Sequence, residues 1–336
     1  MHIHAQTLDD LLRKVFTALL KTKGRVSPTK GENGEIFGIL LELKDPRARL
    51  SRAESRSVFF SCMGEFLWYM SGRNDLEFIK YFIPKYEKFS EKDGTVNGAY
   101  GPRIFNKDGV DQLEFVISKL RNNSESRKAV IQLYDARDTI KEYNDVPCTC
   151  TLQFVLRSGL LHMQTHMRSN DAYMGLPHDV FCFTMMQELL AVILGAKLGS
   201  YKHSVGSLHL YTHDNVNAQA FIDEGFQDNL PMPPIPTSDP FDQIKKLLDI
   251  EQKIRAGASV DSEIRLLNDY WADWARLLLI MAAPTKSVIS AVRTTMKYDV
   301  YETYIRKRHK NANKNSPSAS EPLLFAVVPP NGEDQK

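Results

Sequence analysis

Hydrophobic residues recur along the first part of the chain at spacings typical of helices and half-buried strands. Residues 8–20 carry apolar side chains at helical spacing, which predicts an opening helix. Residues 55–71 predict an amphipathic helix, and a nearly continuous apolar run over residues 179–198 predicts a long buried helix. Strands are predicted at residues 36–43 and 129–134.

Residues 146–179 predict a hairpin with a cysteine at its base. Residues 149–156 alternate loosely between apolar and polar positions, residues 157–159 are typical of a hairpin turn, and residues 160–167 return as a second strand. Cys148 precedes the first strand. At a strand edge a thiol is held rigidly and is still accessible, so Cys148 is a candidate nucleophile.

Polar residues separate this hairpin from the long apolar helix. We interpret residues 168–171 as a polar edge and residues 175–177 as a turn, so that Asp179 begins the helix. Asp is a preferred N-cap, which gives Asp179 a purely structural interpretation beside any chemical one. Cys182, together with five methionines, is expected to pack in the core rather than bind a ligand; the methionines are Met163, Met167, Met174, Met185 and Met186.

Composition narrows the class of protein. A chain of 336 residues with 43% hydrophobic content can bury a large core, and one large domain with an appendage is expected. A net charge of +2 argues against binding nucleic acid or an anionic membrane. The first residues lack the pattern of a secretion signal, and cysteines 62, 148, 150 and 182 are expected to be reduced, without zinc-ligand spacing. These features predict a soluble cytoplasmic protein with no metal.

Six short motifs occur in a fixed order along the chain: Glu65-Phe66-Leu67-Trp68, Tyr100-Gly101, Pro147-Cys148 with Gln153-Phe154, Arg168-Ser169-Asn170-Asp171, Gly175-Leu176-Pro177 and His209-Leu210-Tyr211. Together they resemble the thymidylate synthase family, including its branch that hydroxymethylates cytidylates, over roughly residues 20–236. The resemblance implies an α/β (α+β) fold, in which helices pack against a large mixed sheet.

The resemblance also implies the catalytic residues. Cys148 would add to C6 of a pyrimidine, with Arg168 favouring its thiolate and holding the nucleotide phosphate. Glu65 would be a buried proton relay, and Tyr100 and Asp179 complete the expected catalytic set. The alternatives are an inert thiol at position 148 and a Glu65 side chain that faces water from the edge of its helix.

Binding residues follow from the same resemblance. The expected substrate-binding residues are Arg25, Arg127, Lys128, Arg168, Ser169, Asp171, His209 and Tyr211. The expected residues for the co-substrate 5,10-methylenetetrahydrofolate are Tyr86, Asp171, Met174 and Gly175. In the family the pair at positions 127 and 128 reaches the phosphate of a partner subunit, which implies a homodimer. Ordinary surface charge is the alternative for that pair, and a solvated loop is the alternative for Arg25.

Two positions indicate the base and the product. The family has Asn at the position of Asp179 when it acts on uracil, whereas a carboxylic acid donates to N3 and accepts from the N4 amino group of cytosine. Tyr86 and Phe89 replace two tryptophans that cover the folate, so water rather than hydride is expected to complete the reaction. We therefore predict 5-hydroxymethylation of CMP or dCMP. The alternatives are a thymidylate synthase acting on dUMP and a non-catalytic nucleotide- or RNA-binding protein.

Domain boundaries are predicted at the proline-rich connector. Residues 1–236 are expected to form the catalytic domain and residues 237–308 a helical extension, with helices at 241–256, 262–282 and 287–308. The tail from residue 309 to 336 is expected to be disordered in part, and residues 325–328 are a weak candidate for a segment that closes over the folate.

Overall fold

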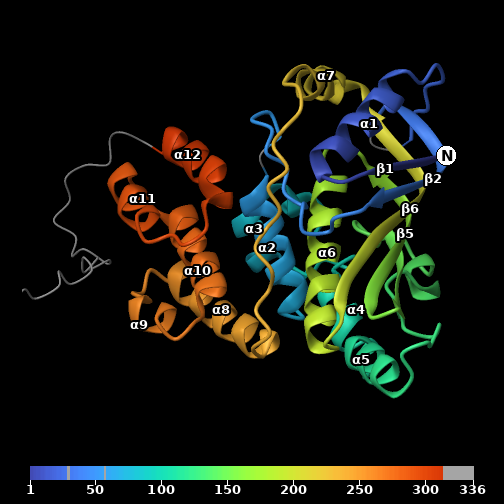
Figure 1. Cartoon of the computed structure of the whole chain (residues 1–336). Coiled ribbons are helices and arrows are strands. Elements are labelled where there is room, and N and C mark those ends of the chain that lie inside the picture. The colour runs from blue at the N-terminus through green and yellow to red at the C-terminus, as the bar shows by residue number, and fades with distance from the viewer. Residues whose placement is uncertain (29–30, 57, 313–336) are drawn as a thin grey trace, which may run out of the picture. The chain divides into compact units, whose positions relative to one another are not determined.

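A mixed sheet organises the first part of the chain in the computed structural model, which describes residues 1–28, 31–56 and 58–312 (Figure 1). Its six strands are β1 (His2–Ala5), β2 (Asn33–Leu43), β3 (Val130–Gln132), β4 (Thr149–Arg157), β5 (Leu160–Asp171) and β6 (Lys197–Tyr211). They lie in the order β1-β2-β6-β5-β4-β3. The β1–β2 and β5–β6 pairs are parallel and the other pairs antiparallel. The predicted α/β class with a mixed sheet is confirmed.

The hairpin of β4 and β5 confirms the predicted turn and corrects the strand that follows it. Ser158 and Gly159 both have positive φ, 50° and 75°, as a two-residue loop between twisted strands requires. The prediction that residues 168–171 form an edge outside the strand is wrong. They continue β5, because Ser169 and Asp171 pair with Ser207 and His209 of β6. The predicted strand over residues 129–134 shortens to β3.

Helix α6 (Leu176–Ile193) lies between the sheet and helix α2 (Phe59–Met70), as Figure 1 shows. Neither helix has the predicted bounds. The turn predicted over residues 175–177 is wrong, because Gly175 is the N-cap of α6 and Pro177 lies in the first turn, where proline is tolerated. Helix α2 is buried nearly all round rather than amphipathic. Helix α6 covers one of its sides.

The composition of α6 follows from its place in the core. It is long and apolar enough to cross a membrane by length and composition, and 78% of that stretch is buried inside the structure. A buried core helix of this kind needs no polar face. Cys182, Met185 and Met186 of this helix pack in the core as predicted. The cytoplasmic location stays a prediction.

Among the described residues, helices cover one face of the sheet and leave the other face open. Along β5 the residues alternate between buried and exposed positions, the pattern of a sheet with a single covered face. Phe37 of β2 is 85% exposed. The opening helix is confirmed as α1 (Leu8–Leu20), which contacts β1, β2 and β6. The remaining elements of this part are α3 (Leu76–Phe82), the 3-10 helix η1 (Pro84–Phe89), α4 (Tyr100–Phe105), α5 (Gln112–Asn122), η2 (Ala136–Thr139), η3 (Thr212–Asp214) and α7 (Asn215–Asp223).

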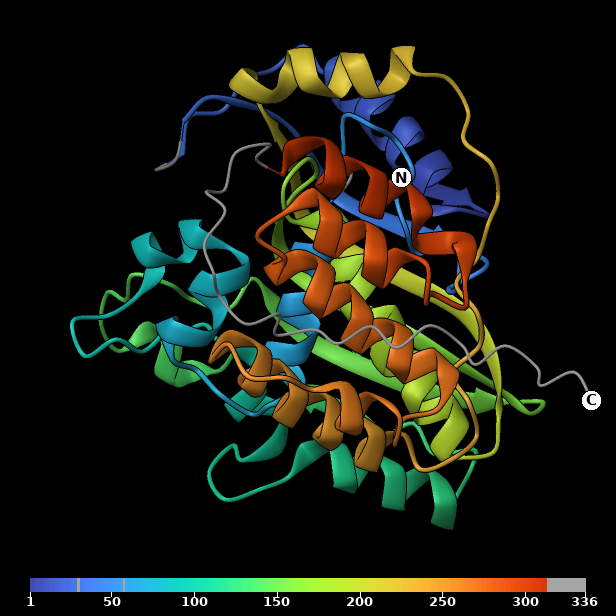
Figure 2. The same cartoon turned by 90° about the vertical axis from the view of Figure 1, so that its left-hand side faces the viewer.

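Two compact units divide the chain, Met1–Pro240 and Phe241–Lys336. The described part of the second unit contains α8 (Pro240–Arg255), α9 (Asp261–Ile264), α10 (Asp269–Ala282), α11 (Lys286–Arg293), η4 (Asp299–Tyr301) and α12 (Glu302–Asn311). In Figure 2, α10 and α12 lie side by side. Trp271 and Trp274 of α10 are buried in the core of this unit. The predicted domain boundaries stay predictions.

Two predicted helices of the second unit are interrupted. The helix predicted over residues 262–282 is divided into α9 and α10. Asn268 is the N-cap of α10 and accepts a hydrogen bond from the Trp271 amide. Buried Asp273 accepts from the amides of Lys297 and Tyr298 and so holds the non-helical segment that breaks the helix predicted over residues 287–308.

The end of the described chain differs from the expected start of the tail. Helix α12 continues to Asn311, three residues past the predicted helix end at 308. The rest of the predicted tail, with the candidate closing segment at residues 325–328, lies outside the described residues.

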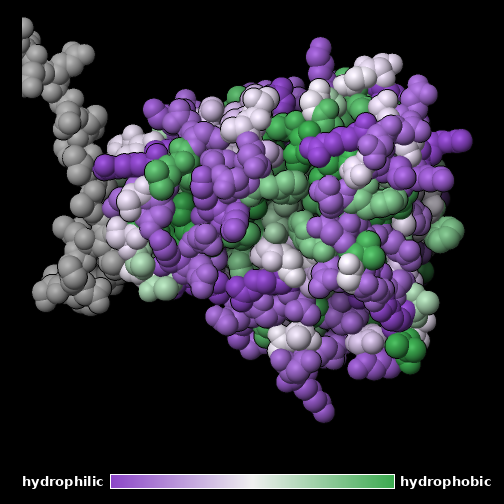
Figure 3. Space-filling model, turned by 90° about the horizontal axis from the view of Figure 1, so that it is seen from below, coloured by the Kyte–Doolittle hydropathy of each residue, from purple (hydrophilic) through white to green (hydrophobic). Residues whose placement is uncertain are grey.

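The face of the molecule seen in Figure 3 is mostly hydrophilic, with smaller groups of hydrophobic residues.

Candidate active site

A cavity of about 370 Å³ lies beside Cys148, between α2, η1, the end of β5 and the start of α6. It gathers all the predicted catalytic residues and all the predicted folate-binding residues. These eight lining residues are Glu65, Tyr86, Tyr100, Cys148, Asp171, Met174, Gly175 and Asp179. Residues separated by more than a hundred positions in the sequence therefore share one site.

Arg168 holds the segment that carries Cys148. Its Nε donates to the carbonyl oxygen of Pro147 and one Nη donates to that of Val146, both at 3.0 Å. The same Nη lies 3.9 Å from Cys148 Sγ. A neighbouring guanidinium stabilises a thiolate, which is the nucleophilic form of cysteine. The contact is that expected for an activated nucleophile, although Arg168 itself is exposed and lies outside the lining of the cavity.

Glu65 is buried beside the cavity, so the alternative in which it faces water is wrong. Its carboxylate accepts hydrogen bonds from Tyr69 at 3.0 Å and Tyr86 at 2.9 Å. Burial raises the pKa of Glu65 to about 6, although both hydrogen bonds oppose that rise. A carboxyl group with a pKa near neutrality can both give and take a proton at physiological pH, as a proton relay must.

Tyr100 fixes the strand that follows the thiol. Its hydroxyl lies 2.9 Å from Thr149 Oγ1 and accepts from the Thr149 amide at 3.2 Å. The ring stacks on Phe183 and lies against Tyr69, which carries the bond to Glu65. Tyr100 therefore couples the start of β4 to the wall of the cavity that contains Glu65.

Asp179 is not a helix cap. It lies in the first turn of α6 after Gly175, to whose carbonyl its amide donates, and no side-chain bond caps the helix. Its side chain is 9% exposed, and Oδ2 accepts from Asn170 Nδ2 at 2.9 Å. Burial, and then the charge of Glu65, raises the pKa of Asp179 well above its ordinary value. The cavity thus contains a buried carboxyl group with a raised pKa.

The opposite wall of the cavity is aromatic and apolar. Tyr86 lies edge-on to Trp68 and to Phe89, with ring centroids 5.3 Å and 5.8 Å apart. Met174 is 37% exposed here, so the expectation that it packs in the core is wrong. A flat pteridine ring needs such a wall for stacking. The residues present fit the folate co-substrate.

Most of the predicted phosphate and sugar contacts lie outside this lining. His209 and Tyr211 sit at the end of β6, with ring centroids 5.0 Å apart, and His209 pairs with Asp171 in the sheet. Seven predicted residues do not line the cavity: Arg25, Arg127, Lys128, Arg168, Ser169, His209 and Tyr211. Of these, Arg25, Arg127, Lys128 and Arg168 are exposed.

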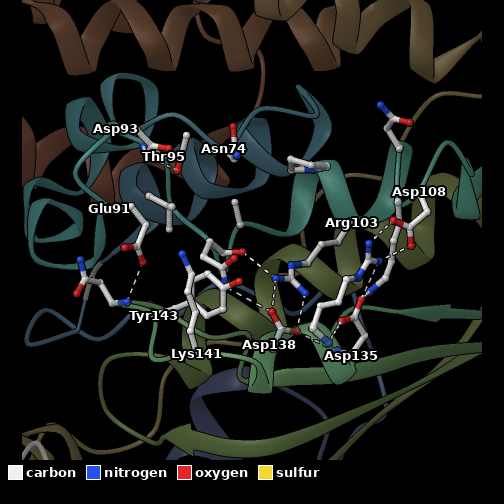
Figure 4. Close-up of a pocket in the computed structure, with 18 of the residues that line it drawn as sticks. Asn74, Glu91, Asp93, Thr95, Arg103, Asp108, Asp135, Asp138, Lys141 and Tyr143 are labelled. Carbon is white, nitrogen blue, oxygen red and sulfur yellow. Dashed lines mark hydrogen bonds and ion pairs between the residues drawn. The ribbon is translucent and has the colours of Figure 1, made fainter.

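A second hollow of about 750 Å³ has a charged lining that is internally paired (Figure 4). Arg103 pairs with Asp138 at 2.5 Å and also donates to the carbonyl oxygens of Leu133 and Asn97. Lys107 pairs with Asp135. These bonds fix η2, which precedes the segment that carries Cys148, so we assign this hollow a supporting role.

Metal chemistry has no obvious place in the part of the chain that the structure describes. Among those residues there is no group of three or more His, Cys, Asp or Glu side chains that could hold a metal ion. Cys62, Cys148, Cys150 and Cys182 are free of disulfides.

Comparison with known proteins decides the family. A family model described as thymidylate synthase matches residues 9–256. This chain belongs to the thymidylate synthase family. The match extends beyond the predicted limits of the resemblance at both ends. Members of the family bind a pyrimidine nucleoside monophosphate and use methylenetetrahydrofolate as co-substrate in one-carbon transfer to C5.

The relatives of this chain include thymidylate synthases and a hydroxymethyltransferase. Thymidylate synthase 1 of Bacillus spizizenii and the thymidylate synthase of Bacillus phage phi3T are each 30% identical over 161 residues, 46% of this chain and 57% of theirs. The chain thus spans little more than half the length of these relatives. The deoxyuridylate hydroxymethyltransferase of Bacillus phage SP01 is 27% identical over 277 residues, 78% of this chain and 71% of its own length.

Some site residues were not assigned a role from the sequence. Tyr69, Asn170 and His178 line the cavity, and the sequence motifs predict no role for them. His178 lines the cavity and lies 2.9 Å from both Ser61 Oγ and the Met174 carbonyl oxygen. A polar residue that lies inside a buried strand or helix requires a partner, and that requirement is the signal that could have pointed to Asn170.

Proposed function

We propose that this chain transfers a one-carbon unit from methylenetetrahydrofolate to C5 of a cytidylate, CMP or dCMP, and releases the 5-hydroxymethyl product. The observation that carries the choice of base is the position of Asp179, a buried carboxyl group with a raised pKa that lines the cavity beside Cys148. The hydroxymethyltransferase among the relatives supports the choice of product.

Cys148 supplies the covalent step. Its thiolate adds to C6 of the pyrimidine, which places electron density on C5. Methylenetetrahydrofolate supplies a one-carbon unit at the oxidation level of formaldehyde. C5 forms the new carbon–carbon bond, loses its proton and carries an exocyclic methylene group after tetrahydrofolate leaves. Water adds to that methylene, the C6–S bond breaks and the thiolate returns. The sum is cytidylate, methylenetetrahydrofolate and water giving hydroxymethylcytidylate and tetrahydrofolate.

Asp179 reads the base through its proton. A neutral carboxyl donates one hydrogen bond to N3 of cytosine and accepts one from the N4 amino group, whereas uracil presents the opposite order. Capping of the helix does not account for an aspartate here, because the side chain makes no capping bond. The burial that raises its pKa therefore supports cytosine as the base.

Polar groups near the reacting carbon support water as the final nucleophile. Glu65, with a pKa of about 6, lies beside the cavity and can take a proton from water. Tyr86 and Phe89 provide an aromatic wall with a hydroxyl group in place of the two tryptophans of the family pattern. Tyr86 is bonded to Glu65, so the wall is connected to the proton relay.

A homodimer is part of the proposal. Arg127 and Lys128 are exposed and do not line the cavity of their own chain, as expected if they reach the phosphate of a partner. The open face of the sheet, on which Phe37 is 85% exposed, is the surface on which we place the second copy.

Methylation of dUMP is the second candidate, because thymidylate synthases are among the relatives. A binding protein without catalysis is less well supported. Nucleotide binding alone requires neither a thiol 3.9 Å from a guanidinium nor a buried glutamate with a pKa near neutrality.

The substitution Asp179→Asn tests the proposal. The amide restores the donor and acceptor order of uracil, and each mismatched buried hydrogen bond costs about 1–3 kcal/mol. The ratio of kcat/KM for cytidylate to that for uridylate should fall by at least about tenfold. Asp9→Asn is the matched control, since Asp9 is also a buried carboxylate with a raised pKa but contacts Ser51 and Arg52 away from the cavity. An unchanged ratio in Asp179→Asn would rule out base reading by this residue.

A further inference from the structure

A chain of buried polar side chains leads from Asp179 into the sheet and begins at Asn170, which also lines the cavity. Asn170 Nδ2 lies 2.9 Å from Asp179 Oδ2 and 3.1 Å from His203 Nε2. His203 Nδ1 lies 2.7 Å from the Tyr201 hydroxyl, which donates to Thr165 Oγ1 at 3.1 Å. All four residues behind Asp179 are buried. Polar groups in this position are costly unless each has a partner.

We infer the direction of each hydrogen bond in this chain from the bond between Tyr201 and Thr165. The single hydroxyl proton of Tyr201 goes to Thr165, so Tyr201 must accept a proton from His203 Nδ1. Burial, and then His166, lowers the pKa of His203 to about 3, so its ring is neutral and its Nε2 is an acceptor. The amide nitrogen of Asn170, rather than its oxygen, must therefore face His203.

Asn170 in turn determines which oxygen of Asp179 accepts a hydrogen bond. Its amide carries two protons, and the acceptors within reach are Asp179 Oδ2, His203 Nε2 and the sulfur of Met167 at 2.8 Å. Sulfur is the weakest acceptor of the three, so the two protons go to Asp179 and His203. Oδ2 of Asp179 is thereby fixed as an acceptor, so a proton bound by this carboxyl lies on Oδ1.

This orientation of the Asn170 amide destabilises the folded protein, and the packing of the core does not require it. Asn170 Oδ1 is buried and has no hydrogen-bond partner among the described residues. An unsatisfied buried carbonyl destabilises a fold, and an apolar side chain at this position would avoid it. A functional requirement for the amide protons accounts for its presence.

We propose that Asn170, His203 and Tyr201 are positioning residues that orient the carboxyl of Asp179 and so set which pyrimidine the enzyme accepts. The inference rests on the proposed function, in which Asp179 contacts the base. Oδ1–H then donates to N3 of cytosine, and the second lone pair of Oδ2 accepts from the N4 amino group. Turning the Asn170 amide would exchange these roles and favour the wrong base.

The test compares kcat/KM for CMP or dCMP with that for the matching uridylate in His203→Phe and Tyr201→Phe. His203→Phe keeps an aromatic ring but removes the acceptor that orients Asn170, so the base ratio should move toward uridylate by about tenfold. Tyr201→Phe removes the partner of His203 Nδ1 and the bond to Thr165, and it should move the ratio by about threefold. Thr184→Val is the control, because buried Thr184 donates to carbonyl oxygens of its own helix, α6. It should leave the ratio unchanged.

A purely structural role gives a different result. Loss of packing lowers kcat/KM for both bases together and leaves their ratio as in wild type, and that outcome in both variants would overturn the inference. If His203→Phe does not fold, Tyr201→Phe decides, since it removes a single oxygen. If the base ratio moves in Asp179→Asn but in neither His203→Phe nor Tyr201→Phe, the positioning role is refuted and the proposed function stands. If the wild-type enzyme prefers uridylate, the proposed base is refuted. A shifted base ratio in His203→Phe and Tyr201→Phe would still support the positioning role.

Discussion

Replacing Glu65 by glutamine should remove a pH dependence of stability that the structure makes measurable. Glu65 is 7% exposed, and its burial raises its pKa from 4.5 to about 6. A carboxyl whose pKa is higher in the folded state binds its proton more tightly there. The folded state is therefore destabilised as pH rises from about 4.5 to about 6. At about 1.36 kcal/mol for each pH unit of pKa difference, the loss is about 2 kcal/mol.

Glutamine keeps the shape of a protonated glutamate and does not titrate. Urea unfolding of both proteins at pH 4.5, 5, 6 and 7 (roughly the window set by the two pKa values) measures the effect. The unfolding free energy of Glu65→Gln relative to wild type should rise by about 2 kcal/mol between the lowest and highest pH. Other buried carboxyls, such as Asp9 and Asp171, occur in both proteins and cancel in this difference. Parallel pH profiles would refute the raised pKa and, with it, the assignment of Glu65 as a proton relay near neutrality.

Three further predictions follow from the same contacts. Cys148→Ser should abolish turnover but keep nucleotide binding by calorimetry, because a serine alkoxide forms far less readily than a thiolate; activity within about tenfold of wild type would exclude the covalent step. Mixing Cys148→Ser with a protein altered at both Arg127 and Lys128 should restore some activity in the heterodimer, whereas a fully active monomer by ultracentrifugation would exclude the shared site. Gly64→Ala should lower the unfolding free energy by about 1–3 kcal/mol, since its Cβ would lie 2.0 Å from the Phe82 ring; an unchanged urea midpoint would show that the ring moves freely.

The residues of the cavity could be predicted because their motifs occur in a specific order. Cys148, Glu65, Tyr100 and Asp179 all line the cavity, although they come from different elements. The sequence could not show whether Asp179 caps its helix, because the first turn of α6 begins three residues earlier and depends on Gly175. Local propensity marks an acidic helix start but does not fix its first residue.

Elements that depend on distant partners were predicted less well. The end of β5 has a polar sequence and is a strand only because β6 pairs with it. The break in the helical region before Tyr298 depends on Asp273, a buried side chain more than twenty residues away. His203 and Tyr201 lie on alternate inward positions of β6, and their contact with Asn170 requires the pairing of two strands. No local pattern reports such contacts.

The product of the reaction tests this account most directly. Purified protein incubated with methylenetetrahydrofolate and, separately, CMP, dCMP and dUMP can be followed by mass spectrometry of the nucleotides. We expect CMP or dCMP to gain the mass of one CH2O unit, with dUMP a poor substrate, because the neutral carboxyl of Asp179 matches cytosine. Methylated uridylate, with both cytidylates unchanged, would contradict the assignment of base and product together.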